Sequence, residues 1–153
     1  MNYSSITSLA LWTLYSGQTS KNVTYIWVLN RTVPRLVDCS DILYIGATQQ
    51  PISKRFTQET RTASGGGNTQ GTNIRLTHVL SQLGVQNCKL YFTSQVLCPV
   101  IQQSPFFANL QIWDKKNFLA FAQHNPASVS LEKYLLVMYA ADHFEVPPLN
   151  NRV

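Results

Sequence analysis

Three segments of the chain combine β-branched and aromatic residues, which is the composition of strands packed into a core. The connection between the first two is polar and contains proline, which predicts an antiparallel hairpin. The segments are 23–29 (VTYIWVL), 42–47 (ILYIGA) and 88–97 (CKLYFTSQVL). The pattern therefore predicts a small, mostly antiparallel sheet of three strands.

Apolar residues at helical spacing occur between and after these strands, so helices are expected to cover the sheet. Pro51 suits the first turn of one helix, and Gly84 ends another. The predicted helices are 51–60, 73–83, 106–123 and a last one from Ser128 or Ser130 to Phe144. The predicted fold class is α+β, a small sheet flanked by helices.

The 153 residues fit one domain over 1–153. Apolar residues in segment 1–20 keep helical spacing, which predicts a helical extension at the N-terminus. Segment 64–72 (SGGGNTQGT) contains four glycines and predicts a flexible loop. It lacks the preceding strand and the lysine of a phosphate-binding loop, so a mononucleotide site is excluded there.

No apolar run reaches the roughly 20 residues that a membrane span requires. The N-terminal segment has neither the basic region nor the small-residue cleavage site of a signal peptide. The three cysteines, Cys39, Cys88 and Cys98, are an odd count without metal-ligand spacing. We therefore expect a cytoplasmic protein with reduced thiols and no membrane partner.

The charge is basic, with 12 Lys and Arg against 7 Asp and Glu and a net charge of +5. Such a field favours polyanions such as nucleic acid, although it does not identify one. The seven acidic residues are scattered along the chain. Any metal chemistry must therefore use one or two carboxylates.

Residues suited to phosphate chemistry follow one another on the predicted elements. Tyr44-Ile45-Gly46 ends the second strand, Lys54-Arg55 lies on the next helix, and Glu132 opens the last helix, before Asn150-Asn151. In this order the chain resembles the GIY-YIG nuclease family over roughly 23–151, with 56–127 matching in element order more than in residues. Each of these residues taken alone has an ordinary structural explanation. The interpretation therefore depends on the order and spacing of the residues along the chain.

The resemblance implies a DNA endonuclease that depends on Mg²⁺ or Mn²⁺, with a restriction-type enzyme as one form considered, and assigns the site residues. Tyr44 and Gly46 belong to the YIG half of the motif. Arg55 corresponds to the catalytic arginine, Glu132 to the metal ligand, and Asn150 or Asn151 to a structural asparagine.

The first half of the motif departs from the family, because Trp27 stands where its first tyrosine is expected. Indole has no ionisable proton, so Tyr25, on the same face of the strand, is the candidate to replace that tyrosine. Tyr44 can orient the attacking water. It can act as a base only if its pKa falls well below about 10.

Phosphodiester hydrolysis also needs positive charge beside the reacting oxygens. Arg55 supplies a planar, permanently charged fork that matches phosphate oxygens. One Mg²⁺ held by Glu132 and water suits a hard cation that keeps most of its hydration shell. In the family that the chain resembles, a histidine often lies one helical turn after the catalytic arginine, and here Glu59 takes its place. Lys54 or Arg61 is left to share the cationic role.

The expected partner is DNA, and its expected contacts are the glycine-rich loop and a set of basic residues, Arg61, Arg75, Lys89, Lys115 and Lys116. A homodimer is considered because one site cuts one strand, so a double-strand break needs two sites or two turnovers. The alternative is a catalytically inactive member of the fold that binds nucleic acid, with Trp27 stacking on a base.

Overall fold

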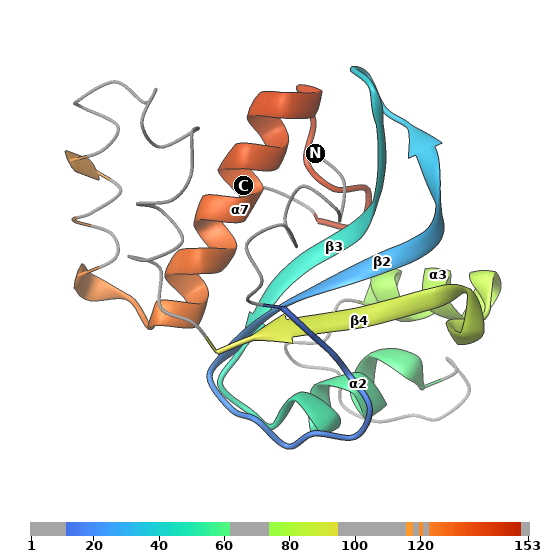
Figure 1. Ribbon diagram of the computed structural model, residues 1–153, viewed down its shortest axis with the longest axis horizontal. Coiled ribbons are helices and arrows are strands. Elements are labelled where there is room, and N and C mark those ends of the chain that lie inside the picture. The colour runs from blue at the N-terminus through green and yellow to red at the C-terminus, as the bar shows by residue number, and fades with distance from the viewer. Residues whose placement is uncertain (1–11, 62–73, 95–115, 118–119, 121–122, 151–153) are drawn as a thin grey trace.

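The computed structural model describes residues 12–61, 74–94, 116–117, 120 and 123–150 (Figure 1). Within them the fold is α+β, with an antiparallel four-stranded sheet in the order β1-β4-β2-β3. The strands are β1 (Thr13–Leu14), β2 (Val23–Pro34), β3 (Cys39–Thr48) and β4 (Cys88–Thr93). The helices are α2 (Ile52–Thr60), α3 (Ile74–Leu83), the short 3₁₀ turn η1 (Val85–Asn87) and α7 (Ala127–His143).

Strands β2 and β3 form the predicted hairpin, but they are longer than predicted. In this hairpin Tyr25 pairs with Gly46 and Trp27 pairs with Tyr44. The register is irregular after Val28, and pairing resumes beside the turn, where Pro34 lies opposite Cys39. The predicted connection therefore shrinks to a tight turn, closed by a 3.0 Å hydrogen bond from Arg35 N to the Asp38 carbonyl. The sequence did not predict this extension of β2, because the residues after Leu29 are polar and exposed and lack the apolar pattern of a packed strand.

The prediction of three strands is wrong by one, because β1 pairs antiparallel with β4, Thr13 opposite Phe92. The predicted helical extension over 1–20 is also wrong in its described part, where Thr13–Leu14 is a strand. Pairing along β4 satisfies backbone groups that an open sheet edge would leave unpaired. The pairing of β1 with β4 is a tertiary interaction, and the helical spacing of apolar residues in the sequence does not predict it. Residues 1–11 lie outside the described residues.

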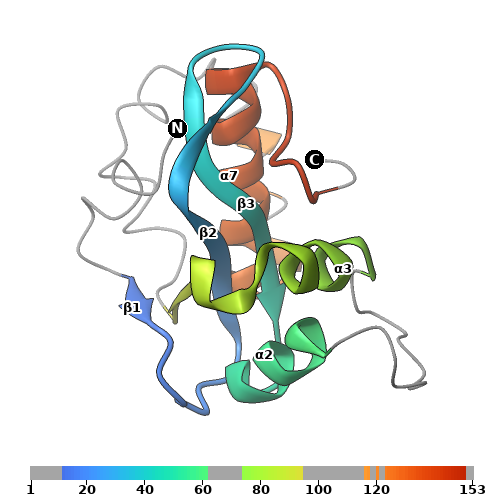
Figure 2. The ribbon, with the colours of Figure 1, turned by 90° about the vertical axis from the view of Figure 1, so that its right-hand side faces the viewer.

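The sheet is covered on both faces, so β2 is buried continuously from Val23 to Leu29. Ile26 and Val28 face α7, together with Ile42 and Ile45 of β3. The alternate residues Tyr25 and Trp27 face the layer of α2 and α3, and Figure 2 shows this layer and α7 on opposite sides of the sheet. The candidate site residues of β2 thus belong to the α2 side.

The helices predicted at 51–60, 73–83 and near the C-terminus are confirmed as α2, α3 and α7. The glycine-rich segment 64–72 and most of the helix predicted at 106–123 lie outside the described residues. Among the helices described, we find none with the length and apolar character needed to cross a membrane.

Candidate active site

Gly46 allows two tyrosines to approach each other at the centre of the hairpin. A Cβ atom at this position would lie 2.6 Å from Cε1 of Tyr44 and 2.8 Å from Cζ of Tyr25. These distances are far shorter than van der Waals contact, so even alanine would displace the rings. With glycine, the ring centroids lie 5.9 Å apart. Gly46 therefore has a structural role in this site.

Glu59, in the last turn of α2, is a carboxylate enclosed by the site, with its side chain 1% exposed. The hydroxyl of Tyr25 donates a 2.6 Å hydrogen bond to Oε1, and the indole N–H of Trp27 donates a 2.7 Å hydrogen bond to Oε2. Burial raises the pKa of Glu59 to about 6, although these two hydrogen bonds and the Arg55 charge lower it. Two donors thus hold a carboxylate that the sequence did not assign to the site.

Trp27 has a different role from the one expected in the nucleic-acid-binding alternative. Its side chain is fully buried, and its ring stacks on Phe56 of α2 with centroids 5.8 Å apart. The N–H of the indole donates a hydrogen bond to Glu59. Trp27 therefore cannot stack on a base in this structure, and its contribution is structural.

Arg55 lies one helical turn before Glu59, on the same side of α2. Its Nε atom is 4.0 Å from Oε1 of Glu59, and its side chain is 15% exposed. The guanidinium therefore sits at the border between the buried carboxylate and solvent. Its charge also lowers the pKa of Glu132, on α7, and of Tyr44, on β3. Arg55 is thus close enough to interact with residues from three elements.

Tyr44 is half-buried on β3, near the charged side chains of Arg55, Glu59 and Glu132. Burial raises its pKa to about 12, with further upward contributions from Glu59 and Glu132. A side-chain hydrogen bond with Tyr25 and the charge of Arg55 act in the opposite direction, but they are smaller effects. Tyr44 is therefore a neutral phenol at neutral pH. The lowered pKa that a base would need is not found.

Glu132 reaches the site from α7, which packs on the other face of the sheet. Strand β3 is an edge strand, so a side chain from the first turns of α7 can approach Tyr44 around this edge. Burial raises the pKa of Glu132 to about 7, and the charges of Arg55 and Lys133 lower it in part. The electrostatic contacts bring together the predicted residues Tyr44, Arg55 and Glu132.

The donor set limits which metal ion this site could hold. Among the described residues, no group of three or more His, Cys, Asp or Glu side chains is placed to hold a metal ion. Glu132 is therefore the candidate ligand, with water completing the shell. Burial raises the pKa of Glu132 to about 7, so a cation bound there would compete with its proton at neutral pH. A single carboxylate ligand suits only a hard cation such as Mg²⁺ or Mn²⁺ that retains most of its water.

Asn150, after α7, fixes the backbone of β3 immediately after Tyr44. Its Nδ2 donates to the Ile45 carbonyl at 2.7 Å, and its Oδ1 accepts from the Ile45 N–H at 3.0 Å. The side chain thus acts like a neighbouring strand on this edge of the sheet. Asn150 has the expected structural role, whereas Asn151 lies outside the described residues.

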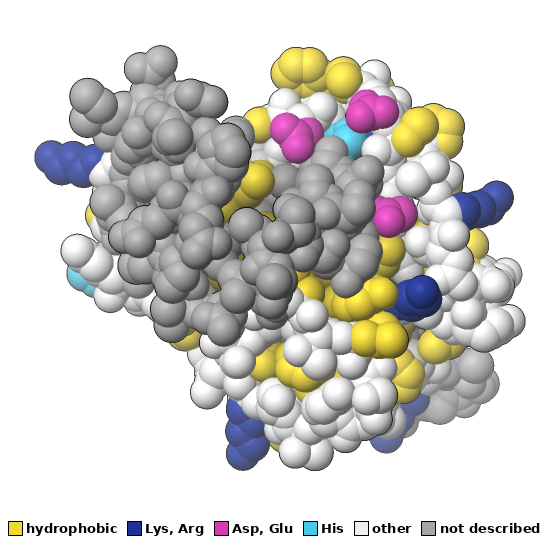
Figure 3. All heavy atoms as spheres, viewed as in Figure 1, with side chains coloured by type: hydrophobic (Ala, Val, Ile, Leu, Met, Phe, Trp, Pro, Cys, Tyr) yellow, Lys and Arg dark blue, Asp and Glu magenta, His cyan; other side chains and the backbone are white. Residues whose placement is uncertain are grey.

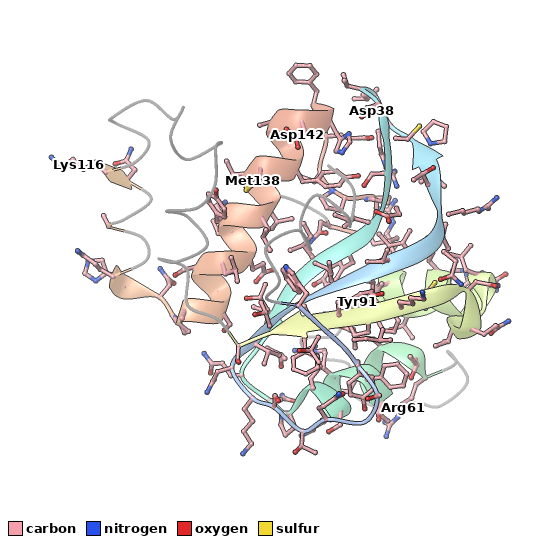
Figure 4. All side chains as sticks on the ribbon, viewed as in Figure 1. Asp38, Arg61, Tyr91, Lys116, Met138 and Asp142 are labelled. Carbon is pink, nitrogen blue, oxygen red and sulfur yellow. The ribbon has the colours of Figure 1, made fainter. Side chains whose placement is uncertain are left out.

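The basic residues expected to contact DNA are dispersed. Lys54, Arg61, Arg75, Lys89 and Lys116 are exposed, whereas Lys115 lies outside the described residues. Figure 4 shows Arg61 and Lys116 on opposite sides of the molecule, and Figure 3 shows Lys and Arg side chains scattered over this face. Acidic side chains gather instead at the end that carries Asp38 and Asp142. On the face shown in Figure 3, the basic side chains of the described residues do not gather into one patch.

Comparisons with family models, curated proteins and solved structures found no match to this chain.

Glu59 is the site residue that sequence reasoning left without a role. Its position four residues after Arg55 on a helix was a usable signal, since side chains at that spacing are neighbours. Its hydrogen-bond donors lie 34 and 32 residues earlier in the chain. Their convergence on one carboxylate depends on how α2 packs on the sheet, which local spacing does not specify.

Proposed function

We propose that this protein is a DNA endonuclease of the GIY-YIG type that hydrolyses phosphodiester bonds with Mg²⁺ or Mn²⁺. The observation that carries the proposal is the convergence of a guanidinium, a phenol and a carboxylate from α2, β3 and α7. Each of Tyr44, Arg55 and Glu132 interacts electrostatically with the other two. The three are far apart in sequence, and they come from the two helical layers and from the edge strand β3.

Each side chain has a task that suits its chemistry. Arg55 is partly exposed, so its fork can contact the oxygens of the scissile phosphate and stabilise charge that develops on them. The neutral hydroxyl of Tyr44 can orient the attacking water by hydrogen bonding. Glu132 would hold the metal ion, which, when bound, acts as a Lewis acid and lowers the pKa of water. Gly46 and Asn150 keep the strand that carries Tyr44 in place.

DNA approaches this site more readily than the opposite end of the hairpin. Acidic side chains gather at that end, near Asp38 and Asp142, where they would repel phosphates (Figure 3). Lys54 and Arg61 lie on or next to α2, close to Arg55 in sequence, and both are exposed. They are the candidates for phosphate contacts beside the reacting group.

A plasmid nicking assay tests the proposal. Wild-type protein with Mg²⁺ should convert supercoiled plasmid to the nicked form, and both EDTA and Glu132→Ala should stop the reaction. Glu145→Ala, two residues after the C-terminal end of α7, is the matched control and should cut at the wild-type rate. Binding to DNA without cleavage under any divalent cation would contradict the enzyme and favour a protein that only binds nucleic acid.

A further inference from the structure

The proposed reaction needs an acceptor for the proton of the attacking water, and Tyr44 alone is a poor one. A phenol with a pKa of about 12 keeps its own proton at neutral pH. It can accept a second proton only if it releases the first one at the same time. The side chains behind Tyr44 determine whether such a release is available.

Hydroxyl and carboxylate groups lead from Tyr44 into the protein. The phenol ring of Tyr44 lies beside that of Tyr25, with centroids 5.9 Å apart, and Gly46 permits this approach. Tyr25 donates its single hydroxyl proton to Oε1 of Glu59 at 2.6 Å. Its oxygen can therefore accept the proton of Tyr44, which leaves the lone pairs of Tyr44 to face the water.

We infer that Glu59 is the terminal proton acceptor of the reaction, reached from the attacking water through the hydroxyls of Tyr44 and Tyr25. This inference rests on the proposed function. It gives Tyr44 and Glu59 different tasks, since Tyr44 contacts the water whereas Glu59 stores the proton. It also gives Tyr25 the role of the connecting group.

The transfer conserves protons and electrons. An O–H bond of water breaks as one forms on Oη of Tyr44, whose own proton moves to Oη of Tyr25. The proton of Tyr25 moves to Oε1 of Glu59. The electron pair of the broken water bond forms the new P–O bond, and the leaving oxygen departs with the electrons of the old one. Glu59 ends neutral, and both tyrosines end as they began.

The surroundings of Glu59 suit this role. Among the described residues, the titratable or charged groups that interact with it are Tyr25 from β2, Tyr44 from β3 and Arg55 from its own helix. Helix α3, which packs on α2, contributes the buried leucines Leu76 and Leu80 to the same layer. With its pKa raised to about 6, Glu59 is ionised at neutral pH, yet it accepts a proton far more readily than an ordinary carboxylate.

Trp27 explains how this carboxylate stays in position. Its indole N–H occupies Oε2 at 2.7 Å, so Oε1 is the oxygen that faces Tyr25. An indole donates one hydrogen bond and accepts none, and it does not titrate. Trp27 is therefore a positioning residue that cannot divert the proton.

Two variants interrupt the proposed path of the proton at different groups. Glu59→Gln removes the acceptor, and Tyr25→Phe removes the connecting hydroxyl but keeps the buried ring. Glu145→Gln is the control, because it makes the same change at the carboxylate that accepts the Leu36 N–H, and glutamine can keep that bond. Circular dichroism establishes which variants are folded, and Tyr25→Phe keeps the test decisive if Glu59→Gln does not fold.

The first readout is the rate of plasmid nicking between about pH 5 and 9. The wild-type rate should rise with pH and level off above an inflection near the Glu59 pKa of about 6. Both variants should lose about a hundredfold in rate at neutral pH and keep rising with pH, because hydroxide becomes the remaining acceptor. Raising the Mg²⁺ concentration separates Glu132 from Glu59, since a metal competes with protons only at its ligand.

The second readout needs neither metal nor DNA. The infrared carbonyl band of a buried, protonated carboxyl group should have a component with a midpoint near pH 6 in wild type. This component should be missing in Glu59→Gln, which keeps only the component of Glu132 with a midpoint near pH 7. Together with the altered rate profiles, this result supports the relay. A midpoint below the ordinary value of 4.5 overturns it even if the protein cuts DNA.

The outcomes separate failure of the relay from failure of the proposed function. If wild type nicks DNA and the two variants keep its rate and its inflection, the relay is overturned and the nuclease stands. If wild type does not nick DNA with any divalent cation, the proposed function fails, and the relay fails with it as a step of hydrolysis.

Discussion

The two faces of β2 are buried to the same degree, but they differ in chemistry. Toward α7, Ile26 and Val28 pack against apolar residues of β3 and α7. Toward α2, the neighbouring residues Tyr25 and Trp27 carry polar groups that end on the buried carboxylate of Glu59. A single strand thus supports an apolar core on one side and a charged one on the other.

This difference in chemistry carries a cost in free energy on the α2 side. Burying an ionised carboxylate costs free energy that hydrogen bonds and one arginine offset only in part. An apolar side chain at position 59 would avoid that cost but would leave the buried Tyr25 hydroxyl and Trp27 N–H without their acceptor. Substitutions on the two faces should therefore have different consequences.

Ile26→Ala tests the apolar face and should have the largest effect on stability. It leaves a cavity in a core where Ile26 is fully buried, so the free energy of unfolding should fall by about 2–5 kcal/mol. Urea denaturation followed by circular dichroism measures this loss, and nicking per folded molecule should be unchanged. Leu36→Ala is the control, because Leu36 is 74% exposed and its loss should change stability by less than about 0.5 kcal/mol. A specific loss of nicking in folded Ile26→Ala would remove the distinction between the faces.

Gly46→Ala tests the charged face through its tyrosines. The added methyl group would meet Tyr44 and Tyr25 inside 3 Å, so overpacking should cost about 1–3 kcal/mol. Displacement of the tyrosines should also slow nicking by about a hundredfold. Gly17→Ala is a useful contrast, because no atom lies within 4 Å of its added Cβ, although its φ of +105° strains the backbone. Both variants should lose stability. Equal nicking rates would count against the tyrosine arrangement.

The pH dependence of stability tests the carboxylate itself. Because burial raises the pKa of Glu59 from 4.5 to about 6, the folded state binds the proton more tightly than the unfolded state. This contribution is present below pH 4.5 and is lost as the pH rises to about 6, a loss on the order of 2 kcal/mol. Urea midpoints measured across this range should fall less steeply in Glu59→Gln than in wild type. Glu132 should still contribute a decline that extends to about pH 7. Superimposable profiles for wild type and Glu59→Gln would contradict the assignment.

Much of the fold was predictable because its elements are long and periodic. The hairpin, α2, α3 and α7 each follow a local pattern that tertiary packing did not override. Strand β1 was not predictable in this way, since two residues carry no periodicity and their pairing depends on the edge of β4. The full lengths of β2 and β3 were also missed, because their polar ends are held by pairing and not by burial.

For the candidate site, the order of residues pointed to Tyr44, Arg55 and Glu132, and in the structure Arg55 is near enough to lower the pKa of the other two. Their catalytic roles stay predictions, and the sequence did not show the contacts that surround them. The environment of Trp27 was not predictable, because an indole in a strand can face solvent or a buried acceptor. The raised pKa of Tyr44 likewise follows from burial and two neighbouring carboxylates, which are properties of the folded chain.

The most direct test of the central claim compares cleavage with binding in Arg55→Ala. If Arg55 stabilises the reacting phosphate beside Tyr44 and Glu132, nicking should fall by about a hundred- to a thousandfold while affinity for DNA changes little. Arg75→Ala, which removes an exposed arginine from α3, should instead leave the cleavage rate of bound DNA unchanged. Equal losses of binding and cleavage in Arg55→Ala, or no loss of cleavage, would contradict a shared catalytic site.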